Sequence, residues 1–352
     1  MLKYILKRIL LVIPVLLIVS LVIMFLLDCS PGDPVDLIAG FDATPEEKEA
    51  IREELGYNDP FFVRYFRYIN NVLHGDWGTS IRTGRPVIDD ILSRFPYSLK
   101  LSALSVIFAA LIGIPIGIYA ATHQYTWKDN ASMFVALFAV SMPGFWFALM
   151  LVRVFSVKLG WFEMSYTGAS WTEWVLPVIA NCLSLAATVA RQMRSNLLEV
   201  IRQDYITTAR SKGLPEFKVI YKHGLKNASI PIVQVLGTMF GTALSGAMIT
   251  ETIFSLPGLG TYTLTGLNNR DYPVIQSSVL FFSAVFCIVI LLIDIAFAFI
   301  DPRIKSQFYG SKKKKKNAAA SNLALASASD TAVSNVAEVE MNGSQEKDKE
   351  AD

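Results

Sequence analysis

The side chains that could bind a metal or act as nucleophiles are few and widely spaced in this 352-residue chain. The histidines and cysteines show none of the short spacings that bring several ligands to one metal ion. They stand at His74, His123, His223, Cys29, Cys182 and Cys287. The sequence also has no G-x-x-x-x-G-K-[ST] phosphate loop, no H-E-x-x-H pair and no G-x-S-x-G motif. We therefore expect no catalytic residue, no metal and no bound cofactor in this chain.

The polar interval from 191 to 231 separates two apolar runs. It holds eight Lys and Arg residues but only three acids, Glu199, Asp204 and Glu216. In its first part, apolar residues recur every four positions, which predicts an amphipathic helix with one apolar stripe. That stripe consists of Leu197, Ile201, Tyr205 and Ala209.

A second short helix is predicted after a glycine corner. Gly213 can adopt the left-handed conformation in which helices often end, and Pro215 suits the first turn of the next helix. Leu214, Phe217 and Ile220 then form a second apolar stripe, and Gly224 is a candidate second stop. The interval therefore predicts two amphipathic helices outside the lipid.

The rest of the composition is that of a membrane protein. The chain is 53% hydrophobic and has a net charge of +2, with the charges segregated between long uncharged runs. Six runs are long enough to cross the hydrocarbon core. We place these spans at roughly 9–28, 97–121, 132–155, 174–190, 230–250 and 277–300. An all-α membrane protein with six transmembrane helices is the expected fold class.

The placement of Lys and Arg orients these spans. Basic residues gather before the first span, after the second, in 191–229 and after the last, which places both termini in the cytoplasm. A cleaved signal peptide is the rival interpretation of the first span. However, the uncharged run from Ile9 to Leu27 is longer than a usual signal core, and no A-x-A site follows it.

Several features between and within the spans have structural rather than catalytic explanations. The interval 29–96 contains many aromatic residues and predicts a folded extracytoplasmic cap, with a polar helix from Glu46. Gly113, Pro115 and Gly117 predict a break in the second span, and Pro143-Gly144 predicts one in the third. These breaks serve either helix packing or a translocation path, which Pro143, Phe145 and Trp146 would line.

Two charged features remain. Asp294 lies inside the last span, where it serves either a structural hydrogen bond or a proton relay. Five lysines, 312–316, follow that span and suit contact with anionic lipid rather than with nucleic acid. The acidic, Ala- and Ser-rich residues from 317 predict disorder.

The 191–231 interval resembles the cytoplasmic loop of permease subunits of ABC importers, whose consensus is E-A-A-x-x-x-G. Gly213 and Ala209 match it, whereas Thr207 and Thr208 replace its Glu and first Ala. The stretch Thr208-Ala-Arg-Ser-Lys-Gly-Leu-Pro215 resembles the peptide-type branch of the family. Further matches to that branch are Tyr4 to Pro14, Ser30 to Pro34, Glu251 to Gly260, Asn269 to Pro273 and Asp301 to Ile304.

This resemblance implies a type I ABC importer permease fold with three regions. Residues 1–96 would form the first span and the cap, 97–306 the permease core, and 307–352 a disordered tail. It implies a prokaryotic cell membrane location and four kinds of partner: a second, non-identical permease, two ATPase subunits that bind the ATP, an extracytoplasmic substrate-binding protein and the lipid bilayer. The implied ATPase-coupling residues are Thr207, Thr208, Ala209, Arg210, Gly213, Leu214, Pro215, Phe217 and Ile220.

The substrates implied are di- and oligopeptides, with glutathione and nickel as variants of the same branch. From the residues alone, an ion-coupled secondary transporter remains open, and so does a membrane enzyme or scaffold. The first alternative would need paired ionisable residues within the spans and internal repeats, but only Asp294 is visible.

Overall fold

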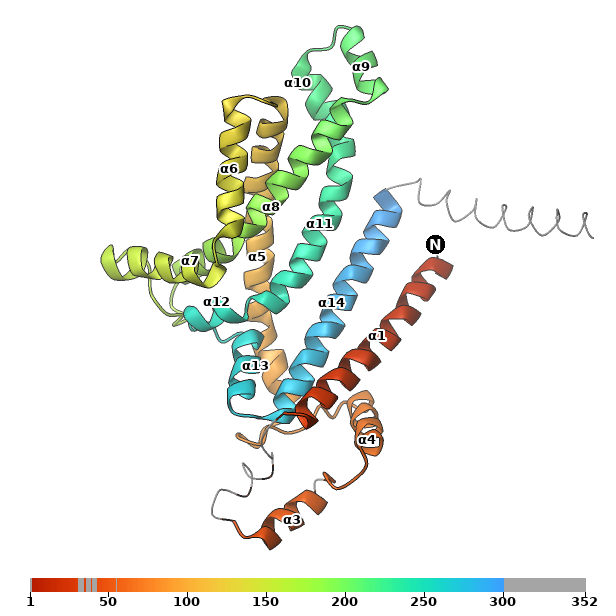
Figure 1. Ribbon diagram of the computed structural model, residues 1–352, viewed down its shortest axis with the longest axis vertical. Coiled ribbons are helices and arrows are strands. Elements are labelled where there is room, and N and C mark those ends of the chain that lie inside the picture. Colours follow the sequence, from red (N-terminus) through yellow and green to blue (C-terminus); the bar gives the residue numbers. More distant parts are fainter. Residues whose placement is uncertain (1, 31–34, 36–38, 40–42, 55, 301–352) are drawn as a thin grey trace, which may run out of the picture. The chain divides into compact units, whose positions relative to one another are not determined.

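The apolar runs of the sequence form long helices in the computed structural model (Figure 1). The structure describes residues 2–300, apart from 31–34, 36–38, 40–42 and 55. In that part of the chain, five helices are long and apolar enough to cross a membrane, and the count is six if a bent helix pair forms one span. The five are α1 (Leu2–Asp28), α5 (Val87–Thr122), α8 (Val175–Ile201), α11 (Leu225–Gly246) and α14 (Tyr272–Ile300). The predicted six-span, all-helical fold is therefore confirmed.

The contacts group residues 2–297 into one unit, and all the packing that follows lies within it. The predicted tail 307–352, its lysine run 312–316 and the stretch Asp301–Ile304 lie outside the described residues, as does most of Ser30–Pro34.

The centre of the unit is the parallel pair α5 and α8, with α11 packed against both. A Cβ on Gly113 or Gly117 would lie 2.5 Å from a backbone carbonyl of α8, Ala186 or Ala190 respectively. The two glycines therefore allow the helix backbones to approach closely. The prediction that they break this span together with Pro115 is wrong, because α5 stays helical from Val87 to Thr122.

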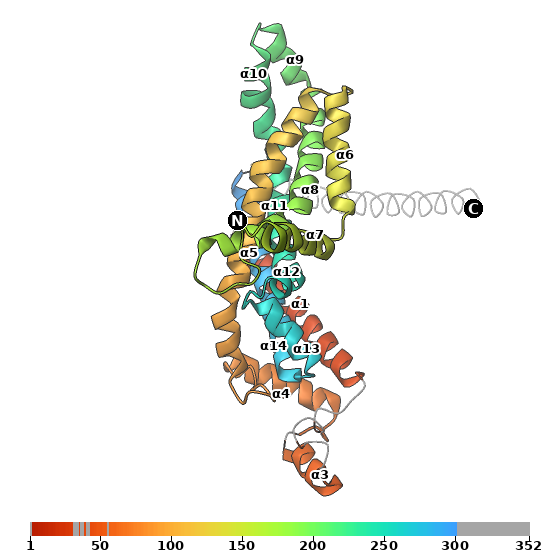
Figure 2. The same ribbon diagram turned by 90° about the vertical axis from the view of Figure 1, so that its left-hand side faces the viewer.

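The third span is broken where Pro143 and Gly144 predict it. The helix α6 (Trp127–Ser141) packs against α8, and then α7 (Gly144–Leu151) with the π-helical turn Val152–Lys158 leaves at an angle of 96°. Figure 2 shows α7 end-on, directed away from the pair α5 and α8. Since Pro143 is the residue before the first turn of α7, its missing N–H leaves no helical hydrogen bond unmade.

Hydrogen bonds to a carboxylate join the segment before α5 to the start of α14. Asp271 accepts from Ser80 Oγ at 2.6 Å and from the backbone N–H of Ile81 and Arg82 at 3.2 and 3.4 Å. The Oγ of Ser277 donates to the carbonyl of Trp77 at 2.6 Å. The stretch Asn269–Pro273 thus holds the start of α5 against the start of α14.

Among the residues that the structure describes between α1 and α5, α3 (Pro45–Glu54) and α4 (Phe61–Leu73) are short helices. The polar helix predicted from Glu46 is α3, and it opens with reciprocal hydrogen bonds between Thr44 and Glu47. These hydrogen bonds lower the pKa of Glu47 below its ordinary value.

A further pair of short helices, α12 (Met248–Ile253) and α13 (Leu259–Asn268), joins α11 to α14. Gly237 and Gly241 on α11 face Ile293 and Phe286 of α14, whose side chains occupy the space that a Cβ on either glycine would need.

Candidate functional site

The predicted two-helix loop projects beyond the ends of α8 and α11 (Figure 1). It consists of α9 (Asp204–Ser211), the single turn α10 (Glu216–Lys218) and a π-helical turn, Val219–Gly224, which runs directly into α11. Two details of the prediction are wrong. The first helix is interrupted after Ile201 instead of running through to Gly213, and Gly224 does not end the second helix.

The corner between the helices depends on backbone conformation. Gly213 has a φ of +75°, as predicted for a helix-ending glycine, and a Cβ there would meet nothing within 4 Å. A β-branched residue would therefore strain the backbone without causing a steric clash. Across the corner, Arg210 binds Glu216 through two hydrogen bonds, Nη2 to Oε1 at 2.5 Å and Nε to Oε2 at 3.1 Å. This pairing raises the pKa of Arg210 and closes the corner.

The loop has its own small core. Ile206 and Val219 are fully buried against Ala209, and Leu214 packs beside them. Ile220 is 7% exposed and belongs to the core between α8 and α11. Leu214, Phe217 and Ile220 therefore do not share one exposed face, because two of the three point into the protein.

The exposed apolar surface of the loop is a pair of aromatic rings. Phe217 is 69% exposed, Tyr221 is 46% exposed, and their ring centroids lie 4.4 Å apart in a stacked arrangement. The other predicted residues on the outside of the loop are Thr207, Thr208, Arg210 and Pro215. Sequence reasoning missed Tyr221, although its spacing of four from Phe217 on a helix was the available signal.

An ion pair joins the base of the loop to the start of α6. Arg194 on α8 donates to both carboxylate oxygens of Asp129 at 2.6 Å, and the backbone N–H of Tyr125 donates to Oδ2 at 3.1 Å. Asp129 is only 1% exposed. A movement of the loop that shifts α8 would therefore also shift α6. No local pattern in the sequence signals this pair, since its members are 65 residues apart.

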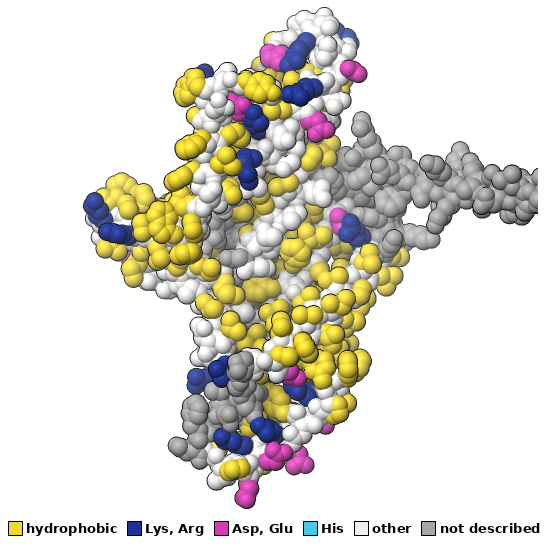
Figure 3. Space-filling model, viewed as in Figure 1, with side chains coloured by type: hydrophobic (Ala, Val, Ile, Leu, Met, Phe, Trp, Pro, Cys, Tyr) yellow, Lys and Arg dark blue, Asp and Glu magenta, His cyan; other side chains and the backbone are white. Residues whose placement is uncertain are grey.

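The residues predicted to line a path lie at the bend between α6 and α7. Phe145 and Trp146 are 52% and 46% exposed on α7, next to Pro143. In the space-filling view, hydrophobic side chains cover α7, whereas charged side chains gather around the α9–α10 loop and near α3 (Figure 3).

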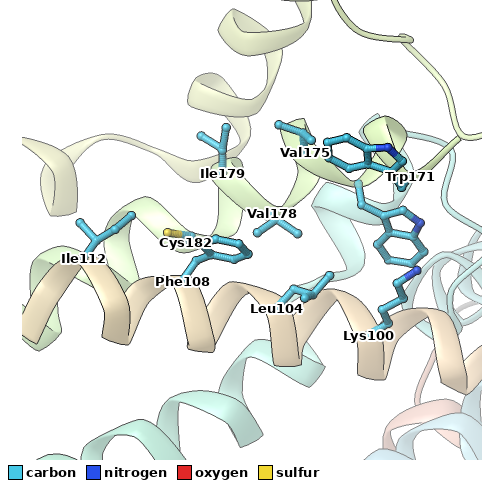
Figure 4. A pocket seen from close by; sticks show the side chains of 10 residues that line it. Lys100, Leu104, Phe108, Ile112, Trp171, Val175, Val178, Ile179 and Cys182 are labelled. Carbon is cyan, nitrogen blue, oxygen red and sulfur yellow. The ribbon is translucent and has the colours of Figure 1, made fainter.

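Side chains of α5 and α8 line a separate apolar cavity of about 370 Å³ (Figure 4). Its lining includes Leu104, Phe108 and Val178, with Lys100 at one end. The ammonium of Lys100 lies 4.1 Å from the ring centroid of Trp174. Phe145 and Trp146 do not line this cavity.

The stretch Glu251–Gly260 forms a buried polar junction at the other end of the spans. Glu251 is fully buried and accepts hydrogen bonds from Ser98 Oγ at 2.6 Å and from the N–H of Thr261 at 3.0 Å. Ser98 Oγ in turn accepts from the N–H of Leu259 at 2.8 Å. Burial raises the pKa of Glu251 despite these donors. The junction fixes α12 and α13 to α5.

Comparisons with known proteins match nearly the whole described chain. The family model for the binding-protein-dependent transport system inner membrane component matches residues 113–306, and the model for the N-terminal part of such membrane components matches 1–102. The chain is 42% identical to the glutathione transport system permease protein GsiC of Salmonella paratyphi A over 306 residues, 87% of this chain and 99% of that protein. The GsiC of Escherichia coli strain K12 is 40% identical with the same coverage.

One solved structure supports the fold. A chain of the inward-facing MetNI methionine ABC transporter aligns with a TM-score of 0.53 at 15% identity, over 60% of this chain and 96% of that one. At this identity the likeness concerns the fold alone.

Proposed function

Because this chain belongs to the family of inner membrane components of binding-protein-dependent transport systems, we propose that it is the permease subunit of an ATP-driven importer of small peptides. Two relatives of at least 40% identity are named as glutathione permeases, and glutathione is a tripeptide. The chain forms one half of a translocation path, and a second, non-identical permease forms the other. Residues 97–306 make up the core, 1–96 the first span with its cap, and 307–352 a tail.

The observation that carries this proposal is the shape of the α8–α11 loop. It presents Phe217 and Tyr221 outward on a corner closed by Arg210 and Glu216, while its own core makes the loop rigid. Such a surface suits insertion into a groove of a partner protein. The partner is an ATPase subunit, which supplies the ATP site for which this sequence has no motif.

The ATPase subunits and the substrate-binding protein bind on opposite sides of the membrane. The ATPase subunits bind at the α9–α10 loop, which together with both chain termini is cytoplasmic. The substrate-binding protein docks at the side that holds the Glu251 junction. Single cysteines test this orientation: residues 60 and 165 should react with an impermeant thiol reagent from outside, and residue 216 should not. External labelling at residue 216 would overturn it.

Uptake into cells identifies the substrate and the energy source. We expect uptake of labelled glutathione or short peptides to persist when the proton gradient is collapsed and to stop when ATP is removed. Uptake of nickel in the same assay would show that the substrate is nickel, a variant within the same branch, instead of a peptide. Loss of uptake with the gradient alone would favour the ion-coupled mechanism. Against that mechanism, Asp294 lies 3.0 Å from the guanidinium of Arg8, which makes it the acidic half of an ion pair.

Coupling is tested with two variants of the loop. Loss of an aromatic anchor at an interface costs about 2 kcal/mol, so Phe217→Ala should weaken ATPase binding about thirtyfold. Gly213→Val should leave the chain in the membrane but abolish stimulation of ATP hydrolysis by loaded binding protein. The control is Trp161→Ala, which removes an aromatic ring of 66% exposure from the loop between α7 and α8. Wild-type binding and stimulation in both loop variants would refute the coupling role.

The bend at Pro143 is proposed to line the path with Phe145 and Trp146. Because a binding protein can supply selectivity, Trp146→Ala should lower the transport rate more than it changes peptide preference. Altered preference at an unchanged rate would contradict this role.

A further inference from the structure

The helix α4 carries an apolar stripe that no described part of the chain covers. Phe62, Phe66 and Leu73 are 64%, 67% and 79% exposed. At about 100° per residue, these three side chains fall within about 40° of one another around the helix. Exposed aromatic and leucine side chains in one line are unusual on a water-facing helix, so the surroundings of this stripe need an explanation.

Two side chains that contact α1 show how deep α4 lies. Arg64 binds Asp28, the last residue of α1, at 2.9 Å. Tyr65 donates its hydroxyl proton to the carbonyl of Leu17 at 2.8 Å and lies 3.1 Å from Ser20 Oγ. Leu17 precedes Asp28 by eleven residues, about 16 Å along a helix. The backbone of α4 therefore lies beside the last turns of α1, between the levels of these two contacts (Figure 1).

The same two side chains show which way the stripe faces. Arg64 reaches toward the end of the span and Tyr65 reaches toward its middle. Phe62 lies about 60° from Tyr65 around the helix, whereas Arg67 lies about 60° from Arg64. The apolar stripe is therefore on the side of α4 that faces the membrane interior, and the polar edge is on the side that faces water.

The stripe also continues an apolar surface of α1. Phe25 is 57% exposed, and its ring contacts Phe61 edge-on with centroids 6.3 Å apart. Only 11% of the most apolar part of the span that contains Phe25 is buried, the smallest share among the five long spans. Aromatic side chains at this level of a span are typical of the membrane–water interface.

We propose that α4 is an interfacial helix, which inserts Phe62, Phe66 and Leu73 among the acyl chains of the leaflet at the Asp28 end of α1. The partner is the phospholipid bilayer itself. Amphipathic helices of this kind sink about 5–10 Å below the headgroup boundary, and the contacts of Arg64 and Tyr65 hold α4 beside the last turns of a span, where such a helix would lie. The insertion holds the segment between α1 and α5 against the membrane surface.

The charges of α4 make its insertion independent of lipid charge. Arg64 is bound to Asp28, and Arg67 is bound to Asp59. With both guanidinium groups neutralised by carboxylates, apolar burial rather than attraction to anionic headgroups drives the insertion.

Spin labels in the complete transporter, reconstituted into phosphatidylcholine vesicles, test this proposal. Phe66→Cys and the control Arg67→Cys are made in a cysteine-free background, and variants that retain uptake are labelled. We expect collisions with oxygen, which partitions into lipid, to exceed those with a water-soluble nickel chelate at position 66. The order should reverse at position 67.

Either of two results would overturn the proposal. More nickel than oxygen collisions at position 66 would place the stripe in water. Protection from both reagents would show that a protein partner covers it. Phe62→Cys provides a second position with the same expected order if Phe66→Cys is not functional. Adding anionic lipid to the vesicles should change neither ratio.

Discussion

The junction at Ser98 offers the sharpest test of how this fold is held together. Ser98 is fully buried on α5, and its hydroxyl both donates to Glu251 and accepts from the N–H of Leu259. Ser98→Ala removes these two hydrogen bonds without adding volume. It leaves a buried carboxyl oxygen and a buried N–H without their partner and removes the hydrogen bonds that fix Glu251 and Leu259 to α5.

The expected cost follows from those two groups. A buried N–H left unsatisfied costs about 1–3 kcal/mol, and a lost hydrogen bond to a charged group about 1.5–3 kcal/mol. Because burial raises the pKa of Glu251 and so favours its neutral form, we expect a total of about 2–5 kcal/mol. For a large domain, this lowers the unfolding temperature by roughly 5–15 °C.

The assay is thermal unfolding of the detergent-solubilised transporter, with Ser102→Ala as the matched control. Ser102 is also fully buried on α5, one turn further on, but its hydroxyl has no hydrogen-bond partner among the described residues. Its removal should change the unfolding temperature little. If Ser98→Ala lowers that temperature no more than Ser102→Ala does, the junction does not stabilise the fold as argued.

Three further outcomes follow from the same structure. Since burial raises the pKa of Glu251, the folded protein retains a proton that the unfolded chain has lost. The free energy of unfolding should therefore fall as pH rises from the ordinary carboxyl pKa to the raised pKa, and then level off. In Glu251→Gln, the free energy of unfolding should change less with pH over this range. Asp129→Asn should lower the free energy of unfolding, measured with denaturant, by about 2–4 kcal/mol and should reduce ATPase stimulation. The control Arg202→Ala, at an exposed position, should change neither. Deleting 317–352 should leave uptake and membrane level unchanged, and a large loss of uptake at a normal membrane level would contradict this.

The sequence by itself determined the features that depend on neighbouring residues. Long uncharged runs can be stable only in lipid, so the class and the six spans follow from composition. The positive φ of Gly213 and the break at Pro143 also follow, because glycine and proline constrain the backbone locally. The family was recognisable from short stretches, such as Thr208–Pro215 and Glu251–Gly260.

Tertiary structure alone decided which side chains meet. Pro115 does not break α5, and the glycines on either side of it serve the close packing against α8. Leu214 and Ile220 turn inward, whereas Phe217 and Tyr221 remain outside, because the loop builds its own core. A periodic pattern shows that residues share a face but not what covers that face.

The ionic and polar junctions join residues far apart in the chain. Arg8 meets Asp294, Arg194 meets Asp129, and Ser98 meets Glu251 across 153 positions. Each of these residues looked isolated in the sequence, as Asp294 did inside its span. Their partners come from other helices, and only the packing of those helices brings a buried charge or hydroxyl to its partner.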